Sequence, residues 1–233
     1  MLGHGLYLDQ WLMLHMNRNW ANACLDHLLP TVTSFAAWTP VIILGVILGA
    51  WRGVFRNRTF LICAALAALL SEGLVSGPLK KIIGRARPHE TMSEVVKRTL
   101  PQARPQILAM FRLPVIESGH ELTLNAKGRS FPSSHIVNMF AVAAVALVFL
   151  GRRGWIFFVA AALVAWSRVY CGVHWPSDVL GSAPLGLLTG WGVTRLAELW
   201  WIKYGSYWMP AAHRSHPSLI ERADGNLSDQ RRA

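Results

Sequence analysis

Five long apolar segments limit what this chain can fold into. They run over 34–51, 59–79, 135–150, 155–171 and 177–194. A helix rises about 1.5 Å per residue, so segments of this length cover about 24–31 Å, close to the roughly 30 Å hydrocarbon core of a bilayer. The segments therefore predict an all-α fold, a polytopic membrane bundle of five transmembrane helices.

The amino-acid composition agrees with a membrane protein and excludes other classes. Apolar residues make up 53% of the chain and charged residues 15%, whereas soluble domains carry about 25% charged residues. Disordered chains have the opposite balance, with low hydrophobicity and many charges. The net charge of +11 does not indicate a nucleic-acid partner, because no basic helix or zinc-finger spacing accompanies it. Basic residues beside membrane spans instead meet anionic lipid headgroups.

The segments divide the chain into one domain and a tail. Residues 1–208 are expected to form a single membrane-embedded domain, in which 1–33 is an N-terminal segment in the membrane interface. Within that segment, 6–16 alternates apolar and polar positions at helical spacing and predicts a short interfacial helix, a sixth if counted with the spans. The stretch 80–134 is expected to be an extramembrane loop with room for one short helix. Residues 209–233 are polar and basic, and are expected to be disordered.

The distribution of basic residues predicts the orientation. The short connections 52–58 and 151–154 carry five arginines and no acidic residue, and the tail is basic as well. The positive-inside rule places this side in the cytoplasm. Five crossings then put the N-terminus, the 80–134 loop and the 171–177 connection together on the opposite face.

Two clusters of polar residues lie on that opposite face, at the ends of the second and third segments. Lys80 and Arg87 are seven residues apart, so they share one face of a helix that Pro88 ends. The sequence FPSSH over 131–135 opens the third segment, where a proline, two hydroxyls and free backbone N–H groups form a ready anion site. Taken singly, the first is also typical of juxtamembrane cations, and the second of a serine N-cap beside an interfacial histidine.

A third cluster, SRVYCGVHWPSD over 167–178, brings Arg168, His174 and Asp178 to a membrane boundary. Ionisable groups at this depth are costly and point to function, although a snorkelling arginine and an acid at a helix start would explain them singly. Together, the three clusters supply several cations, two histidines and a carboxylate. Phosphoryl transfer without a metal needs this set, because it requires charge neutralisation, a nucleophile and a proton donor.

No metal or cofactor is predicted from the remaining residue pattern. The histidines and acids show no spacing typical of metal ligands. Cys24, Cys63 and Cys171 are scattered along the chain and predict neither a disulfide framework nor a metal cluster.

The order KxxxxxxRP, PSxH and SRxxxxxHxxxD, spread over about residues 60–195, resembles the three-part signature of the type 2 phosphatidic acid phosphatase superfamily. The spacing within the first and third parts matches fully. One departure is Ser134, which stands where the family usually has glycine. The backbone N–H is kept there, and the added side chain is expected to narrow the pocket or to add a hydrogen bond.

The resemblance implies a role for each matching residue. His174 would be the nucleophile that forms a phosphohistidine, and Asp178 would orient its imidazole and stabilise its charge. His135 would protonate the leaving oxygen and then activate water. The residues that would bind the phosphoryl oxygens are Lys80, Arg87, Ser133, Ser134 and Arg168.

Three further charged residues lie near these clusters. Lys81 and Arg85 are expected to reach outward to lipid phosphates rather than to take part in catalysis. Glu72, eight residues before Lys80, is expected either to tune the site or to be a satisfied buried acid.

The resemblance implies a lipid phosphate substrate: undecaprenyl diphosphate, phosphatidylglycerol phosphate, phosphatidic acid or a lipid A phosphate, with the first favoured. The expected partners are this substrate and the bilayer, and the oligomeric state is not predicted. The expected location is a bacterial plasma membrane, with the active site facing the periplasm and the C-terminus in the cytoplasm.

Two other functions remain open. A phosphohistidine can be intercepted by a lipid acceptor, which would make the protein a phosphotransferase, or the same cationic pocket could serve non-catalytic lipid binding or transport. Vanadium haloperoxidases resemble the superfamily in their anion site, but they are soluble, and the five apolar segments disfavour that reading.

Overall fold

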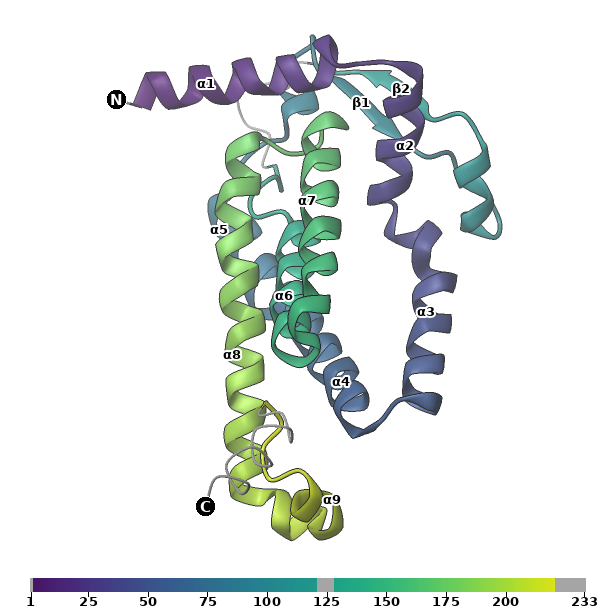
Figure 1. Cartoon of the computed structure of the whole chain (residues 1–233). Coiled ribbons are helices and arrows are strands. Elements are labelled where there is room, and N and C mark those ends of the chain that lie inside the picture. Colours follow the sequence, from purple (N-terminus) through teal and green to yellow (C-terminus); the bar gives the residue numbers. More distant parts are fainter. Residues whose placement is uncertain (1, 121–127, 221–233) are drawn as a thin grey trace.

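A computed structural model describes residues 2–120 and 128–220 of the chain. Three elements give the layout in Figure 1. Helix α1 (Leu2–Leu14) lies across one end of the molecule, roughly perpendicular to the long helix α8 (Pro176–Trp208). The short helix α9 (Pro210–Ser215) lies at the other end of α8.

Helix α6 (Ser134–Leu150) is the centre of the bundle. It packs against α4 (Phe55–Leu70), α7 (Trp155–Tyr170) and α8. Its contact with α8 depends on small residues, because a Cβ added at Gly186 would lie 2.4 Å from the carbonyl oxygen of Val137, and one at Gly190 would lie 2.2 Å from that of Ala141. Small residues that let backbones approach are typical of helix pairs in membranes.

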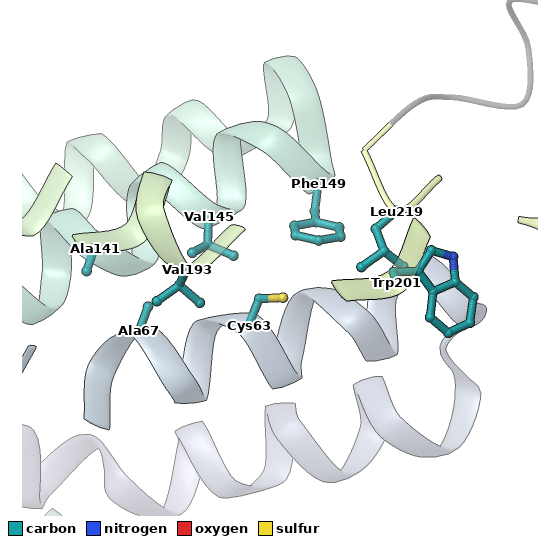
Figure 2. Close-up of a cluster of buried hydrophobic side chains, with 8 residues drawn as sticks. All are labelled: Cys63, Ala67, Ala141, Val145, Phe149, Val193, Trp201 and Leu219. Atoms are coloured by element: carbon teal, nitrogen blue, oxygen red, sulfur yellow. The ribbon is translucent and has the colours of Figure 1, made fainter. Parts of the chain in front are cut away.

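The largest hydrophobic core lies between α4, α6 and α8 (Figure 2). Its buried members are Cys63, Ala67, Ala141, Val145, Phe149, Val193, Trp201 and Leu219. Because Leu219 follows α9, the segment after α8 folds back and closes this core at the end away from α1. The buried carboxylate of Glu198 on α8 fixes that segment by accepting hydrogen bonds from Leu219 N at 2.7 Å and from Ser218 Oγ at 2.5 Å.

The second apolar segment contains an irregular turn. Helix α4 continues into the π-helical turn η2 (Ser71–Ser76) and then into α5 (Gly77–Ile83). Pro78 has no backbone N–H to continue the regular ladder, and π-helical turns are frequent near functional sites. Gly84 ends α5 with a φ of 61°, a conformation that glycine adopts at little cost.

The described part of the chain is mostly helical, as the sequence predicts, and it also contains a small β-hairpin that the sequence does not predict. Strands β1 (Val96–Thr99) and β2 (Val115–Ser118) pair antiparallel, with Val96 opposite Ser118. They lie inside the stretch expected to be a loop, which also holds two 3-10 turns, η3 (Pro88–Glu90) and η4 (Gln106–Phe111). Strands of four residues carry too little alternation to stand out from a loop.

The two ends of the chain contain more regular structure than the sequence indicates. The N-terminal segment forms α1, the π-helical turn η1 (His15–Asn19) and α2 (Ala23–Thr33), so it holds two helices instead of one. Part of the tail expected to be disordered is the helix α9, and 216–220 packs against α8. Residues 221–233 lie outside the described part of the chain.

Within residues 2–120 and 128–220, three stretches are long and apolar enough to cross a membrane: 35–52, 55–90 and 134–170. The first is helix α3 (Phe35–Arg52), the second joins α4, η2 and α5, and the third contains both α6 and α7. Helix α8 begins where the fifth segment was expected but extends 14 residues beyond its expected end at 194. The count of five crossings stays a prediction.

Candidate active site

The third cluster is folded into a tight turn between α7 and α8. The backbone N–H groups of Val173 and His174 both donate to the carbonyl oxygen of Arg168, at 3.2 and 3.3 Å. Gly172 has a φ of 72°, and a Cβ there would lie 2.5 Å from the carbonyl oxygen of Val96. This turn brings His174 back toward Arg168 and buries the imidazole, which is 3% exposed.

His174 faces a fully buried carboxylate. Its Nδ1 lies 3.6 Å from Oδ2 of Asp178, slightly longer than a hydrogen bond, as is common in active sites without substrate. The same oxygen accepts hydrogen bonds from the backbone N–H of Trp175 at 3.0 Å and from the Ser130 hydroxyl. Asp178 lies in the first turn of α8, where a negative charge is stabilised by the helix dipole.

The first and second clusters meet through Lys80 and Ser134. The Lys80 ammonium donates a short hydrogen bond to the Ser134 hydroxyl in the first turn of α6. The chain before α6 runs beside the first cluster, because Ser130 N donates to the Arg85 carbonyl at 2.8 Å. Ser133 N donates to the Ser182 hydroxyl at 2.9 Å, which ties the start of α6 to α8.

The charged groups of all three clusters lie close enough to interact. His135 lies within electrostatic reach of Lys80, Arg87, Arg168 and His174, and Arg168 lies within reach of Arg87. The structure therefore brings together the residues that the three sequence motifs predict, although they come from three separate parts of the chain.

Several polar atoms of these residues are buried without a hydrogen-bond partner in the described part of the chain. They are Arg87 Nε, Ser133 Oγ, Arg168 Nε and His174 Nδ1. Leaving such a group unpaired costs about 1–3 kcal/mol. An anion with several oxygens would satisfy the arginine and serine donors together, so these atoms fit a site for a phosphoryl group.

Burial keeps the His174 imidazole neutral. Desolvation lowers the pKa of His174 to about 4, and the positive charges of Arg168 and Arg87 act in the same direction, against the opposing effect of Asp178. At neutral pH the ring therefore carries a lone pair on one nitrogen. This is the form that can attack an electrophile.

Across residues 2–120 and 128–220, the structure shows no group of three or more His, Cys, Asp or Glu side chains arranged to hold a metal ion. The cations of this site are protein side chains, which can neutralise a phosphate directly.

The part of the chain that carries the three clusters matches a known protein family. The family model of the PAP2 superfamily matches residues 61–202, which is more than half of the chain. The chain belongs to the PAP2 superfamily. The phosphatases of this superfamily are metal-independent hydrolases.

Two curated relatives of this PAP2 protein are named as bacterial phosphatases. The undecaprenyl-diphosphatase BcrC of Bacillus subtilis is 34% identical over 86 residues, which cover 36% of this chain and 44% of that protein. A lipid A 4'-phosphatase of Bacteroides thetaiotaomicron is 25% identical over 173 residues, 71% of this chain and 67% of that protein. The matched region spans about half the length of the first curated relatives, between 44% and 54%.

A solved structure supports the fold of the PAP2 protein. The crystal structure of LpxE from Aquifex aeolicus has a TM-score of 0.57, with 22% sequence identity over 81% of this chain and 95% of that chain. At this identity the likeness concerns the fold alone. The PAP2 protein is an integral membrane protein with bacterial relatives.

The sequence predicts that Arg85 reaches outward to lipid phosphates, but in the structure its side chain points to two carboxylates instead. Its NH1 lies 2.6 Å from Asp178 Oδ1, and its NH2 lies 2.6 Å from Asp9 Oδ2 on α1. Sequence reasoning missed Asp9 and Ser130 altogether as site residues. The one available signal for Asp9 is that a carboxylate interrupts the apolar residues of the first helix.

Glu72 is exposed in the structure. This excludes one of the two roles expected for it, that of a buried acid whose charge is satisfied inside the bundle.

Proposed function

We propose that this PAP2 enzyme hydrolyses the phosphomonoester or diphosphate of a lipid through a phosphohistidine at His174. The observation that carries the proposal is the set of buried donors without partners beside a neutral, buried imidazole. Lys80, Arg87 and Arg168 would hold the phosphoryl oxygens, together with the hydroxyls of Ser133 and Ser134 and the free N–H groups at the start of α6.

In the first step, Nε2 of His174 attacks phosphorus as the bond to the leaving oxygen breaks. His135 gives its proton to that oxygen, so the lipid product departs as a neutral alcohol or a protonated monophosphate. Asp178 accepts the Nδ1 proton of His174 in a hydrogen bond and stabilises the positive charge that develops on the ring. The three cations offset the negative charge of the equatorial oxygens.

In the second step, water attacks the phosphohistidine. His135, now neutral, takes a proton from the water as the new oxygen–phosphorus bond forms and the phosphorus–nitrogen bond breaks. Inorganic phosphate leaves, and His174 returns to its neutral form. The two histidines lie within electrostatic reach of each other, so both can act on one phosphoryl group.

Undecaprenyl diphosphate is the substrate that we favour, because BcrC, named as an undecaprenyl-diphosphatase, is 34% identical over its matched region. Lipid A is the next candidate, because a lipid A 4'-phosphatase aligns with the largest share of this chain among the relatives described above. Phosphatidylglycerol phosphate and phosphatidic acid are the remaining candidate substrates.

The experiment is a phosphate-release assay of the purified protein with each of these lipids, using His174→Ala as the blank. We expect release to fall by about 10³-fold or more in the blank, because a nucleophile is lost. Acid-labile, base-stable radioactivity on the wild type after brief exposure to a ³²P-labelled lipid would identify phosphohistidine. Near-normal turnover by His174→Ala would refute this mechanism.

The same assay separates the other two functions. A phosphotransferase would move the label to an added lipid acceptor with little free phosphate. A binding or transport protein would retain labelled lipid in both the wild type and the His174→Ala variant, with no release from either.

We further propose five membrane crossings, with the active site facing the periplasm. Arg152, between α6 and α7, and Leu113, beside the β-hairpin, are both exposed and lie on opposite sides of the membrane in this arrangement. After the three native cysteines are replaced, an impermeant maleimide should label Leu113→Cys in intact cells and should not label Arg152→Cys. The reverse labelling pattern would place the active site in the cytoplasm.

A further inference from the structure

A single arginine joins the N-terminal helix to the active-site carboxylate. One nitrogen of Arg85 lies 2.6 Å from Asp178 Oδ1, and the other lies 2.6 Å from Asp9 Oδ2. The two carboxylates come from residues far apart in the chain, one on α1 and one on α8. Because the guanidinium group presents its donors in a rigid planar fork, it fixes the two carboxylates relative to each other.

Asp9 also holds the first turn of α8. Its Oδ1 accepts a hydrogen bond from the backbone N–H of Ser177 at 2.8 Å, and its Oδ2 accepts one from the Ser177 hydroxyl at 2.5 Å. That hydroxyl also lies 2.8 Å from Arg85 NH1. Asp9 therefore caps the helix turn that carries Asp178, in addition to binding the arginine that contacts Asp178.

These contacts divide the two oxygens of Asp178 between two tasks. Oδ1 is bound by Arg85, whereas Oδ2 accepts from Ser130 and Trp175 and faces His174. The carboxylate is fully buried and Asp9 is 6% exposed. Removing one partner of a buried ion pair leaves an uncompensated charge, which the remaining groups must move to satisfy.

We infer that Arg85 and Asp9 are positioning residues of the active site, so that helix α1 is a part of the catalytic apparatus. Arg85 holds Asp178 with Oδ2 toward His174, and Asp9 keeps Arg85 and the start of α8 in place. This inference rests on the proposed role of His174 as nucleophile. Neither residue contacts the phosphoryl group in this arrangement, so their loss lowers kcat and leaves KM nearly unchanged.

A pocket gives access to the bridge from outside. It has a volume of about 260 Å³ and is lined by Asp9, Arg85 and Trp175, together with residues of α1 and of the segment around η3. The Arg85 guanidinium carbon lies 5.2 Å from the centre of the Trp175 ring. A free guanidinium ion can therefore enter through this pocket and occupy the position that a truncated Arg85 side chain leaves.

The experiment compares four purified variants with the wild type in the phosphate-release assay. Arg85→Ala removes the side chain that joins the two carboxylates. Arg85→Lys keeps the positive charge, but its single ammonium group cannot bind both carboxylates in the geometry of a guanidinium group. Asp9→Asn removes the negative charge and keeps a side-chain oxygen that can accept hydrogen bonds from Ser177. Lys97→Ala is the matched control, because Lys97 forms an exposed ion pair with Glu117 at 2.8 Å on the β-hairpin, at the same end of the molecule.

We expect Arg85→Ala to lower kcat by about 100-fold, the loss typical of a catalytic group misplaced by about 1 Å. Asp9→Asn and Arg85→Lys should each lower kcat by about tenfold, with KM within about threefold of the wild type in every variant. Guanidinium chloride at tens of millimolar should restore Arg85→Ala by at least about tenfold, and should restore neither Arg85→Lys nor Asp9→Asn. Lys97→Ala should match the wild type.

Thermal unfolding of each variant in detergent shows whether a loss of activity comes from a loss of the fold. If Arg85→Ala does not fold, the two conservative variants carry the test. Wild-type kcat in folded Arg85→Lys and Asp9→Asn, loss of kcat without rescue in a folded Arg85→Ala, or a rise in KM at constant kcat would each overturn the inference. Equal phosphate release by the wild type and His174→Ala would overturn the proposed nucleophile instead, while dependence of that release on Arg85 would still report on the bridge.

Discussion

Protonation of His174 should make the free energy of unfolding depend on pH. The imidazole is 3% exposed, and burial lowers its pKa from 6.5 to about 4. In the unfolded chain the ring takes up a proton near pH 6.5, whereas in the folded protein it resists protonation until the pH approaches 4. Between these two values the unfolded state binds the extra proton, so folding stability falls as the pH falls.

The size of this term follows from the pKa difference. One pKa unit corresponds to about 1.4 kcal/mol, so a shift from 6.5 to about 4 destabilises the folded state by on the order of 3 kcal/mol at acid pH. The term is absent above about pH 7, grows through pH 6 and 5, and is complete below about pH 4.

The assay is equilibrium unfolding in detergent micelles at pH 4–8, followed by tryptophan fluorescence, for the wild type and His174→Gln. The variant lacks the titrating ring, so its free energy of unfolding should change less with pH, by on the order of 3 kcal/mol between pH 7 and 4. Other acidic groups titrate in both proteins and cancel in the comparison. Equal pH slopes for the two proteins would show that His174 is not held neutral by burial.

Four further changes have defined outcomes. kcat/KM should fall as the pH falls through about 4, because protonated His174 cannot attack phosphorus; a constant kcat/KM down to pH 3.5 would contradict this. Ser134→Gly removes a hydroxyl that we place among the groups holding the phosphoryl oxygens and should raise KM about two- to fivefold, since such a hydrogen bond is worth about 1 kcal/mol; a lower KM would show that the hydroxyl, which binds Lys80, competes with the phosphate for that lysine. Gly190→Ala puts a Cβ 2.2 Å from a backbone oxygen and should destabilise by about 1–3 kcal/mol, whereas Gly192→Ala, with nothing within 4 Å, should keep or raise the unfolding temperature. Activity should persist in excess EDTA and be inhibited by vanadate, a transition-state analogue; loss in EDTA with recovery in Mg²⁺ would refute metal independence.

The helices and the meeting of the three motifs follow from local sequence. Long apolar segments form helices whatever surrounds them, because the backbone in a bilayer must satisfy its own hydrogen bonds. Motifs at the ends of such segments meet when the segments run back and forth between two faces. This is why His135, at the start of the third segment, and His174, in the connection 171–177, are expected at one site, and the structure places them within electrostatic reach of each other.

The features that sequence did not predict depend on contacts between distant residues. Arg85 resembles any basic residue at a membrane boundary until Asp9, 76 positions earlier, is placed beside it. Leu219 lies in a polar stretch and becomes part of the core only because Glu198 binds its backbone N–H. The strands β1 and β2 are likewise separated by a 15-residue connection. In each case the partner is chosen by the folded chain, and no short sequence pattern specifies it.

The electrostatic balance of the site explains why Arg85 is paired with Asp9. The charges that meet at the two histidines are those of Lys80, Arg87, Arg168 and Asp178. With His174 neutral and His135 protonated, as the proposed first step requires, they leave three positive charges, which offset the negative charge of a lipid phosphate or diphosphate. Arg85 alone would fix Asp178 but add a fourth positive charge beside the pocket. Because Asp9 cancels that charge, the bridge orients the carboxylate and keeps the pocket matched to the charge of the phosphate.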